Sequence, residues 1–234
     1  MMHELKFRHE LKYIVSAAEL LDLKIRLSGI MYPDPHARNG KYLIRSIYFD
    51  DFYNSRVLAN EEGDSPREKW RIRAYNCDRS FISLECKRKE CGMILKTSCG
   101  LSENQYHGLL DGMERMADGN SPLLNRFLYE QQTTLLRPTV IVQYIRMPLV
   151  YPSGNVRVTF DCNIESADDI SGFFDPVIPA RPILTSGMHL LEVKYDEYIP
   201  DPIYHAVQMT NMRQETFSKY CLCREFSRKG ITAI

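Results

Sequence analysis

The sequence of 234 residues has no apolar run of about 18 residues, so no segment is expected to cross a membrane. Its charged first residues, Met-Met-His-Glu-Leu-Lys-Phe-Arg, contain no apolar signal core. It also lacks an excess of either charge, because 30 Lys and Arg residues balance 30 Asp and Glu residues. A nucleic-acid coat or a basic membrane-surface protein is therefore not indicated. We expect one cytoplasmic domain that spans residues 1–234 and does not insert into a membrane.

Common nucleotide-binding and nucleophile motifs are missing as well. There is no Walker loop, no dinucleotide-binding Gly-rich loop and no Ser nucleophile motif. Any bound ATP must therefore be held by side chains rather than by a backbone cradle. The seven cysteines also lack metal-ligand spacing, since Cys221 and Cys223, for example, are only two residues apart. We expect these cysteines to be reduced thiols.

What the sequence does contain is a series of segments in which polar and apolar residues alternate, as in strands. The predicted strands are residues 5–15, 42–50, 67–75, 81–89, 93–98, 139–150, 156–164 and 188–196. Helices are expected between some of them, because Ser16 with Glu19 and Ser102 with Gln105 form capping boxes and Pro122 suits a first helical turn. This pattern predicts an α+β fold, an eight-stranded antiparallel β-barrel tunnel with helices packed on its outside.

One face of these strands is strongly basic. Within residues 67–75, Arg71 and Arg73 lie on one face, and Trp70 and Ile72 lie on the other. A solvent-exposed face would also be polar, but Ser, Thr and Asn would then be mixed with the charges. Outer helices need an apolar sheet face to pack on, so the basic faces should point inward. They would form a lumen lined by Arg8, Lys12, Arg71, Arg73, Lys87, Arg146, Arg157 and Lys194.

Such a lumen requires anions, because burying many unpaired cations is prohibitive. The same faces carry only a few carboxylates, which are Glu10, Glu85, Asp161 and Glu192. Arg binds phosphate oxygens in a bidentate manner, and isolated carboxylates suit a divalent metal that also binds phosphates. The pattern therefore predicts a tunnel for a chain of phosphates. Asp50 and Asp51 could also bind metal, but we expect them to cap the short helix that follows.

Eight motifs, in order along nearly the whole chain, resemble the polyphosphate polymerase domain of the vacuolar transporter chaperone (VTC) family. They are RHELKY (8–13), IRSIYFD (44–50), KWRIRAY (69–75), LECK (84–87), YIR (144–146), VRVTFD (156–161), LEVK (191–194) and FSKY (217–220). That family belongs to the triphosphate tunnel metalloenzymes, the CYTH-like superfamily, which is built on an eight-stranded antiparallel tunnel. The resemblance implies a metal-dependent phosphotransferase that builds polyphosphate from the γ-phosphate of ATP, with Mn²⁺ or Mg²⁺ as cofactor.

The resemblance also implies roles for residues that match its motifs. Phosphate-binding catalytic residues would be Lys12, Arg71, Arg73, Lys87, Arg146, Arg157, Lys194 and Lys219. Further ATP- or phosphate-binding residues would be Arg8, Lys69 and Lys89. The metal ligand would be Glu192, with Glu10 and Glu85 as additional metal candidates.

Two positions depart from the pattern of related proteins. Hydrolytic members of the superfamily often begin with Glu-x-Glu-x-Lys, and Arg8 stands at the first Glu, which favours transfer over hydrolysis. Glu215 and Thr216 stand where eukaryotic family members carry a second Lys. A tripolyphosphatase or nucleoside triphosphatase of the same fold, with a water near Glu10 or Glu85, is an alternative function. A non-catalytic polyphosphate-binding module is another, and the oligomeric state and any membrane-protein partner stay open.

Overall fold

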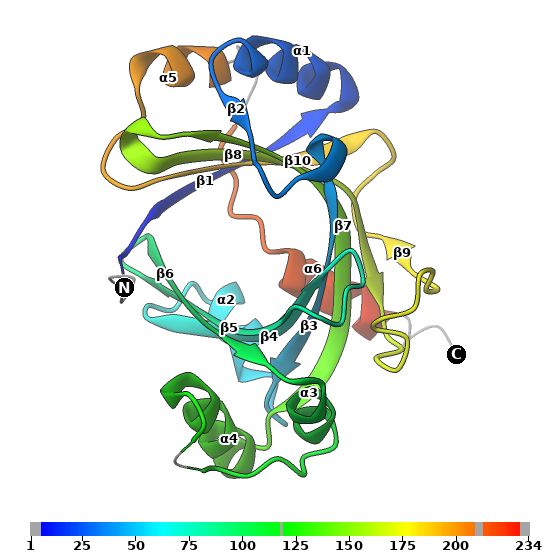
Figure 1. Cartoon of the computed structure of the whole chain (residues 1–234). Coiled ribbons are helices and arrows are strands. Elements are labelled where there is room, and N and C mark those ends of the chain that lie inside the picture. Colours follow the sequence, from blue (N-terminus) through cyan, green and yellow to red (C-terminus); the bar gives the residue numbers. More distant parts are fainter. Residues whose placement is uncertain (1–5, 118, 209–212, 230–234) are drawn as a thin grey trace.

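The computed structural model describes residues 6–117, 119–208 and 213–229. One curled antiparallel sheet forms its centre, with eight long strands in the order β1-β10-β8-β7-β3-β4-β5-β6 (Figure 1). They are β1 (His9–Ser16), β3 (Tyr42–Asp50), β4 (Arg67–Tyr75), β5 (Ile82–Glu90), β6 (Met93–Leu101), β7 (Arg137–Tyr151), β8 (Val156–Ala167) and β10 (Met188–Tyr195). Two short strands, β2 (Tyr32–Pro33) and β9 (Arg181–Pro182), pair with β7 and β8. All eight predicted strands are confirmed.

The edges of the sheet, β1 and β6, meet at one backbone bridge. Arg8 and Ile94 exchange two N–H···O hydrogen bonds of 2.9 Å. Further along β1, the C-terminal part of the chain pairs with this edge in place of β6, since the Glu215 N–H donates to the Lys12 carbonyl oxygen at 2.9 Å. The sheet is therefore a nearly closed barrel, as predicted, with a seam between β1 and β6.

Four helices cover the outside of the sheet. α1 (Ala17–Ser28) and α5 (Asp201–Val207) pack on β8 and β10, while α3 (Glu103–Leu110) and α4 (Pro122–Thr134) pack on β4 and β5 (Figure 1). α1 and α3 begin at the predicted capping boxes. Within the described part of the chain, no helix has both the length and the apolar character needed to cross a membrane.

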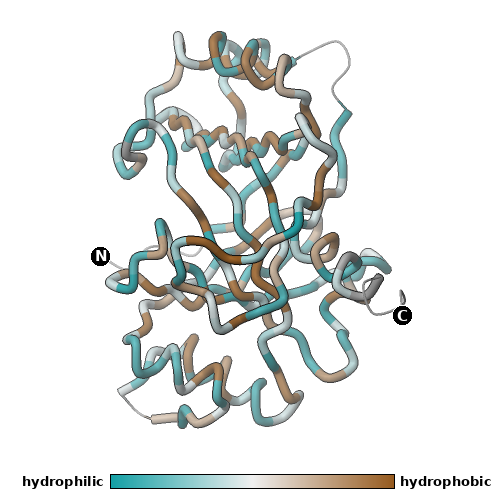
Figure 2. The backbone as a smooth tube through the Cα atoms, turned by 90° about the vertical axis from the view of Figure 1, so that its right-hand side faces the viewer, coloured by the Kyte–Doolittle hydropathy of each residue, from teal (hydrophilic) through white to brown (hydrophobic). Residues whose placement is uncertain are grey.

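The apolar faces of the strands point toward these helices, as predicted. Trp70 and Ile72 pack in one buried cluster with Phe127 of α4, and Val158 and Val193 pack in another with α1. Hydrophobic and hydrophilic residues alternate along the strands (Figure 2). The polar faces therefore point into the concave side of the sheet.

A fifth helix, α2 (Ser55–Glu61), follows β3 and is capped by the end of that strand. The Asp50 carboxylate accepts the backbone N–H groups of Arg56 at 3.0 Å and Val57 at 3.2 Å. Asp51 accepts the N–H of Ser55 at 3.0 Å. The predicted capping role of both aspartates is confirmed.

The sixth helix, α6 (Lys219–Lys229), differs from the outer ones because it packs on the concave side of the sheet. Tyr220 belongs to a buried cluster with Tyr48 and Tyr144. Tyr48 lies directly opposite Arg71 in the β3–β4 register, so it points to the same, inner face. An apolar cluster around α6 thus fills part of the interior, and the charged residues line the rest.

Tyr220 attaches α6 to the sheet. Its hydroxyl donates to the Asp50 carboxylate at 2.6 Å, and its ring stacks on Tyr48 with centroids 4.8 Å apart. Because Tyr220→Phe removes a buried hydrogen bond to a charged acceptor, we expect it to lower the free energy of unfolding by about 1.5–3 kcal/mol. Urea denaturation measures this loss. Tyr204→Phe, at a side chain that is 47% exposed, is the control, and equal losses in both variants would contradict the prediction.

Candidate functional site

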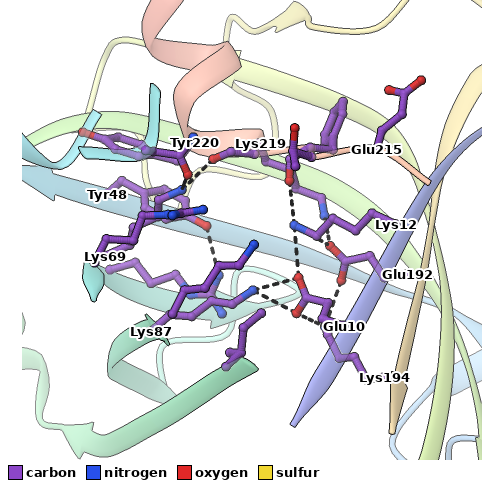
Figure 3. Close-up of a pocket in the computed structure, with 18 of the residues that line it drawn as sticks. Glu10, Lys12, Tyr48, Lys69, Lys87, Glu192, Lys194, Glu215, Lys219 and Tyr220 are labelled. Carbon is purple, nitrogen blue, oxygen red and sulfur yellow. Dashed lines mark hydrogen bonds and ion pairs between the residues drawn. The ribbon is translucent and has the colours of Figure 1, made fainter. Parts of the chain in front are cut away.

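A cavity of about 340 Å³ lies between the two halves of the curled sheet. Lys69 and Lys87 face Glu10, Lys12 and Lys194 across it (Figure 3). Its cationic lining residues are Lys12, Arg67, Lys69, Arg71, Arg73, Lys87, Lys89, Arg146, Lys194 and Lys219. The lining carboxylates are fewer, namely Glu10, Glu61, Glu192 and Glu215. The structure thus brings most of the predicted site residues together around a strongly basic space.

Glu192 on β10 makes the largest number of ion pairs in the cavity. Its carboxylate accepts from Lys219 at 2.7 Å, from Lys194 at 2.8 Å and from Arg146 at 3.1 Å. Asp161, behind the cavity wall, binds Arg146 at 2.7 Å and Lys219 at 2.6 Å. Burial opposes the negative charge of Glu192, but Lys194, Lys219 and Arg146 outweigh it and hold the pKa of its carboxyl well below the usual range.

Glu10 on β1 links the two walls of the cavity. Both of its oxygens accept from Lys87 on β5 at 2.9 Å, and it lies 3.0 Å from Lys12 and 3.7 Å from Lys194. Burial opposes the charge of Glu10, yet these lysines hold the pKa of its carboxyl well below the usual range. Burial lowers the pKa of Lys87 to about 7, and Glu10 acts in the opposite direction. The ion pair therefore favours the charged form of both groups.

Arg71 on β4 is fixed in place by Glu85 on β5. Its Nε and Nη2 lie 2.7 Å and 2.6 Å from one oxygen of Glu85, and its Nη1 donates to the Tyr48 hydroxyl at 2.9 Å. Lys96 donates to the other oxygen of Glu85 at 3.1 Å. Unlike Glu10 and Glu192, Glu85 does not line the cavity. This position does not support the prediction of Glu85 as a metal candidate, because its carboxylate orients Arg71 instead.

Arg73, the next inward-facing residue of β4, is bound mainly by hydroxyl groups. It donates to Ser46 Oγ at 3.1 Å and to the Tyr144 hydroxyl at 3.3 Å. Its nearest carboxylate oxygen, on Glu85, is 3.8 Å away. The charge of this buried guanidinium is thus less fully paired than that of Arg71, which leaves it suited to an anion in the cavity.

Lys69 and Lys89 both line the cavity, but their surroundings differ. Lys69 donates to Asn60 Oδ1 at 2.6 Å and to Ser218 Oγ at 2.8 Å, and burial lowers its pKa to about 8. It therefore connects β4 to α2 and to the start of α6. Lys89 lies directly opposite Arg67, and neither cation forms an ion pair with a described residue. Arg67 was absent from the predicted set, although its alternation with Arg71 places it on the same face.

Arg8 and Arg157 lie outside the cavity, which corrects their predicted place in its lining. Arg8 binds Asp196 at 2.7 Å. Arg157 pairs with the buried Asp34 and donates to the Tyr42 hydroxyl at 3.1 Å. Alternation along a strand fixes the face on which a side chain lies, but it does not fix the position along the tunnel. Arg8 directly precedes β1, and Arg157 is the second residue of β8, so both lie at the ends of the expected strands.

The segment 214–218 completes the cavity wall and was not predicted to do so. It runs beside β1, and the Lys12 ammonium donates to the Phe217 carbonyl oxygen at 2.7 Å. Three tyrosines, Tyr48, Tyr144 and Tyr220, also line the cavity. The FSKY motif was the available signal for this segment, but nothing in its local pattern shows that it pairs with the first strand.

Glu10 and Glu192 are the carboxylates that could hold a divalent cation. Both face the cavity, and Lys12 and Lys194 each lie within 4 Å of both. Among the residues that the structure describes, no three His, Cys, Asp or Glu side chains gather as a metal site. The pair therefore fits a cation that takes one or two carboxylates and completes its coordination with phosphate oxygens and water. It does not fit a closed site made of protein ligands alone.

Comparison with known proteins gives a consistent result. Residues 7–227 match the family model of the VTC domain. No curated protein matches the chain. A solved structure of a putative adenylyl cyclase, HpAC1 from Hippeastrum, described as having a dominant triphosphatase activity, is similar with a TM-score of 0.57 and 12% identity, covering 95% of this chain and 96% of that one. The PH1819 protein from Pyrococcus horikoshii is similar with a TM-score of 0.52 and 12% identity, covering 94% and 99%. At these identities the likeness establishes a shared fold.

Proposed function

The chain belongs to the VTC domain family, and from this premise we propose that it is a metal-dependent polyphosphate polymerase. It would transfer the γ-phosphate of ATP to a polyphosphate chain inside the cavity. The observation that carries this proposal is the excess of cations, since ten line the cavity against four carboxylates. Such an excess requires a ligand with many negative charges along a narrow path, and a chain of phosphates has this chemistry.

The reaction asks for alignment and charge neutralisation more than for proton transfer. The attacking group is a terminal phosphate oxygen that is already ionised, so no general base is needed. Arg71, held by Glu85 and Tyr48, presents a guanidinium of fixed orientation to the cavity. Arg73 and Arg146 lie on the same face of the sheet, where they can bind the transferring phosphoryl group and the phosphates next to it.

Mn²⁺ or Mg²⁺ would be held by Glu192, together with Glu10, and when bound would neutralise charge on the phosphate oxygens. The lysines around these carboxylates, Lys12, Lys194 and Lys219, would bind the remaining oxygens. Lys219 is positioned for this by α6, because Tyr220 and Ser218 attach the start of that helix to the sheet.

A triphosphatase is the second candidate, and the observation that favours it is the described activity of the Hippeastrum protein of similar fold. Hydrolysis needs a water oriented toward the phosphoryl group, and Glu10 is the carboxylate closest to that task. In the ligand-free protein both oxygens of Glu10 accept from Lys87. Arg8, at the position of the first Glu of the hydrolytic motif, adds no carboxylate and points to Asp196 instead.

The purified protein, incubated with ATP and Mn²⁺, should form ADP together with polyphosphate chains that gel electrophoresis resolves. Chelation of the metal with EDTA should stop synthesis, and added Mn²⁺ should restore it. Release of free phosphate in the same amount as ADP, without chains, would indicate a triphosphatase. Tight binding of polyphosphate without ADP formation would indicate a non-catalytic binding module.

A further inference from the structure

Glu10 lies among three lysines that come from three different strands. Its carboxylate, with a side chain only 3% exposed, contacts Lys12 from β1, Lys87 from β5 and Lys194 from β10. Both of its oxygens lie 2.9 Å from Lys87. Within the described chain, Glu10 is the one carboxylate that forms an ion pair with Lys87. The arrangement resembles the way in which several ammonium groups surround a phosphate.

All three lysines line the cavity, so a phosphate chain that entered it would need the same hydrogen-bond donors. A carboxylate oxygen and a phosphate oxygen accept the same N–H groups and repel each other at close range. We propose that Glu10 is an internal competitor for the phosphate chain: it occupies Lys12, Lys87 and Lys194 in the free protein and is displaced from them when the anion binds. This inference rests on one part of the proposed function, the binding of phosphate chains in the cavity, and does not require that the protein transfers phosphate.

The other acids near the cavity are less suited to this role. Glu192 is held from behind by Arg146 and Lys219, which also bind Asp161. Its contacts therefore belong to a network that is anchored in the wall. Glu10 reaches across the cavity from an edge strand, only two residues from the bridge at Arg8. Movement of Glu10 would thus free three lysines of the cavity without disturbing the network that anchors Glu192.

Displacement also makes Glu10 available to a second partner. Once its oxygens leave the lysines, they are available to a divalent cation that binds with the phosphates. The cation and the phosphate chain should therefore increase each other's affinity. A cation bound to Glu10 keeps that carboxylate away from the lysines that the phosphate chain needs, and a phosphate chain bound to the lysines leaves Glu10 available to the cation. Such coupling is reciprocal by thermodynamic necessity.

The test measures binding of inorganic tripolyphosphate by calorimetry, in EDTA and at a pH well below 7, because burial lowers the pKa of Lys87 to about 7. Glu10→Gln keeps the shape of the side chain and removes its charge, and we expect it to bind tripolyphosphate about tenfold more tightly than the wild type. Glu215→Gln removes one charge from a lining carboxylate that forms no ion pair with a described residue, and it is the matched control, for which we expect a much smaller gain. With Mn²⁺ present, the wild type should gain more affinity than Glu10→Gln.

Glu10→Asp serves as a second variant, because it keeps the charge balance of the fold but shortens the reach toward Lys87. It should bind tripolyphosphate more tightly than the wild type and less tightly than Glu10→Gln. If both Glu10 variants bind like the wild type or like Glu215→Gln, Glu10 is not a competitor and the inference is overturned. If neither the wild type nor any variant binds tripolyphosphate, the proposed function fails and this inference fails with it.

Discussion

Replacing Arg73 with methionine should reduce the rate of phosphoryl transfer by about 100- to 1,000-fold, because it removes a buried donor that, under the proposed function, binds the transferring group. The fold should survive this change. The partners of Arg73 are the hydroxyls of Ser46 and Tyr144. Its nearest carboxylate, Glu85, remains paired without it, because Arg71 and Lys96 lie closer to Glu85 than Arg73 does. Steady-state rates with ATP and Mn²⁺ measure the loss, and thermal unfolding tests the fold. A folded Arg73→Met protein with normal turnover would show that this guanidinium is not part of the catalytic site.

Arg71→Met should behave differently, since it should lose stability as well as activity. Arg71 supplies the two closest contacts to the buried Glu85, at 2.7 Å and 2.6 Å. Removing one partner of a buried ion pair costs about 3–5 kcal/mol, although Lys96 and Arg73 remain near Glu85 to reduce this cost. Arg88→Met is a matched control on β5, because Arg88 pairs with Glu68 and Glu90 on the outer side of the sheet. Its turnover should equal that of the wild type.

Glu192→Gln should reduce turnover by at least about 100-fold and shift the dependence of the rate on Mn²⁺ to higher concentrations. A carboxylate repels a bound polyanion, and under the proposed function a metal bound to both would offset this repulsion. Rates measured against Mn²⁺ concentration, for the wild type and the variant, provide the test. If Glu192 serves only as a charge partner of Lys194 and Lys219, turnover should fall little and the two metal curves should have the same midpoint.

The same variant should also show a change that needs no turnover. Lys194, Lys219 and Arg146 all pair with Glu192, so without its charge these cations repel one another more strongly. We expect a lower melting temperature in ligand-free buffer and a larger stabilisation by tripolyphosphate than in the wild type, because the anion replaces the missing charge. Equal stabilisation of both proteins by tripolyphosphate would contradict this expectation.

The strands and their faces could be predicted from the sequence because the alternation is unusually regular. Within β4, four cations alternate with Glu68, Trp70, Ile72 and Ala74, and both bounds of that strand were predicted correctly. Helix starts were predictable for a similar reason, since Ser16 with Glu19 and Ser102 with Gln105 are local signals. These features depend on residues close in sequence, where periodicity and hydrogen bonding leave few alternatives.

What could not be predicted depends on contacts between distant segments. The alternation of β8 fails at Asn163, which has a left-handed φ of 50°, and the strand accommodates an extra residue opposite Tyr144 there. Beyond this bulge Ile164 points inward and joins the cluster around α6. Nothing in the sequence of α6 itself shows that it packs inside the sheet. Glu85 and Arg157 are likewise kept out of the cavity lining by partners from other segments, which are Arg71 for Glu85 and Asp34 with Tyr42 for Arg157.

The pairing of β1 with β10 has a consequence for the order in which the protein can fold. β1 is synthesised first among the long strands, but its partner residues 188–195 are made last, so Lys12 meets Glu192 across about 180 positions of sequence. Contacts of such long range form slowly, because a large loop must close before they contribute any stability. Until then, the edge of β1 is unpaired while the chain is still being made. The hairpin of β4 and β5 can form early, so a nascent chain carries Arg71 with Glu85 long before the opposite wall of the cavity exists.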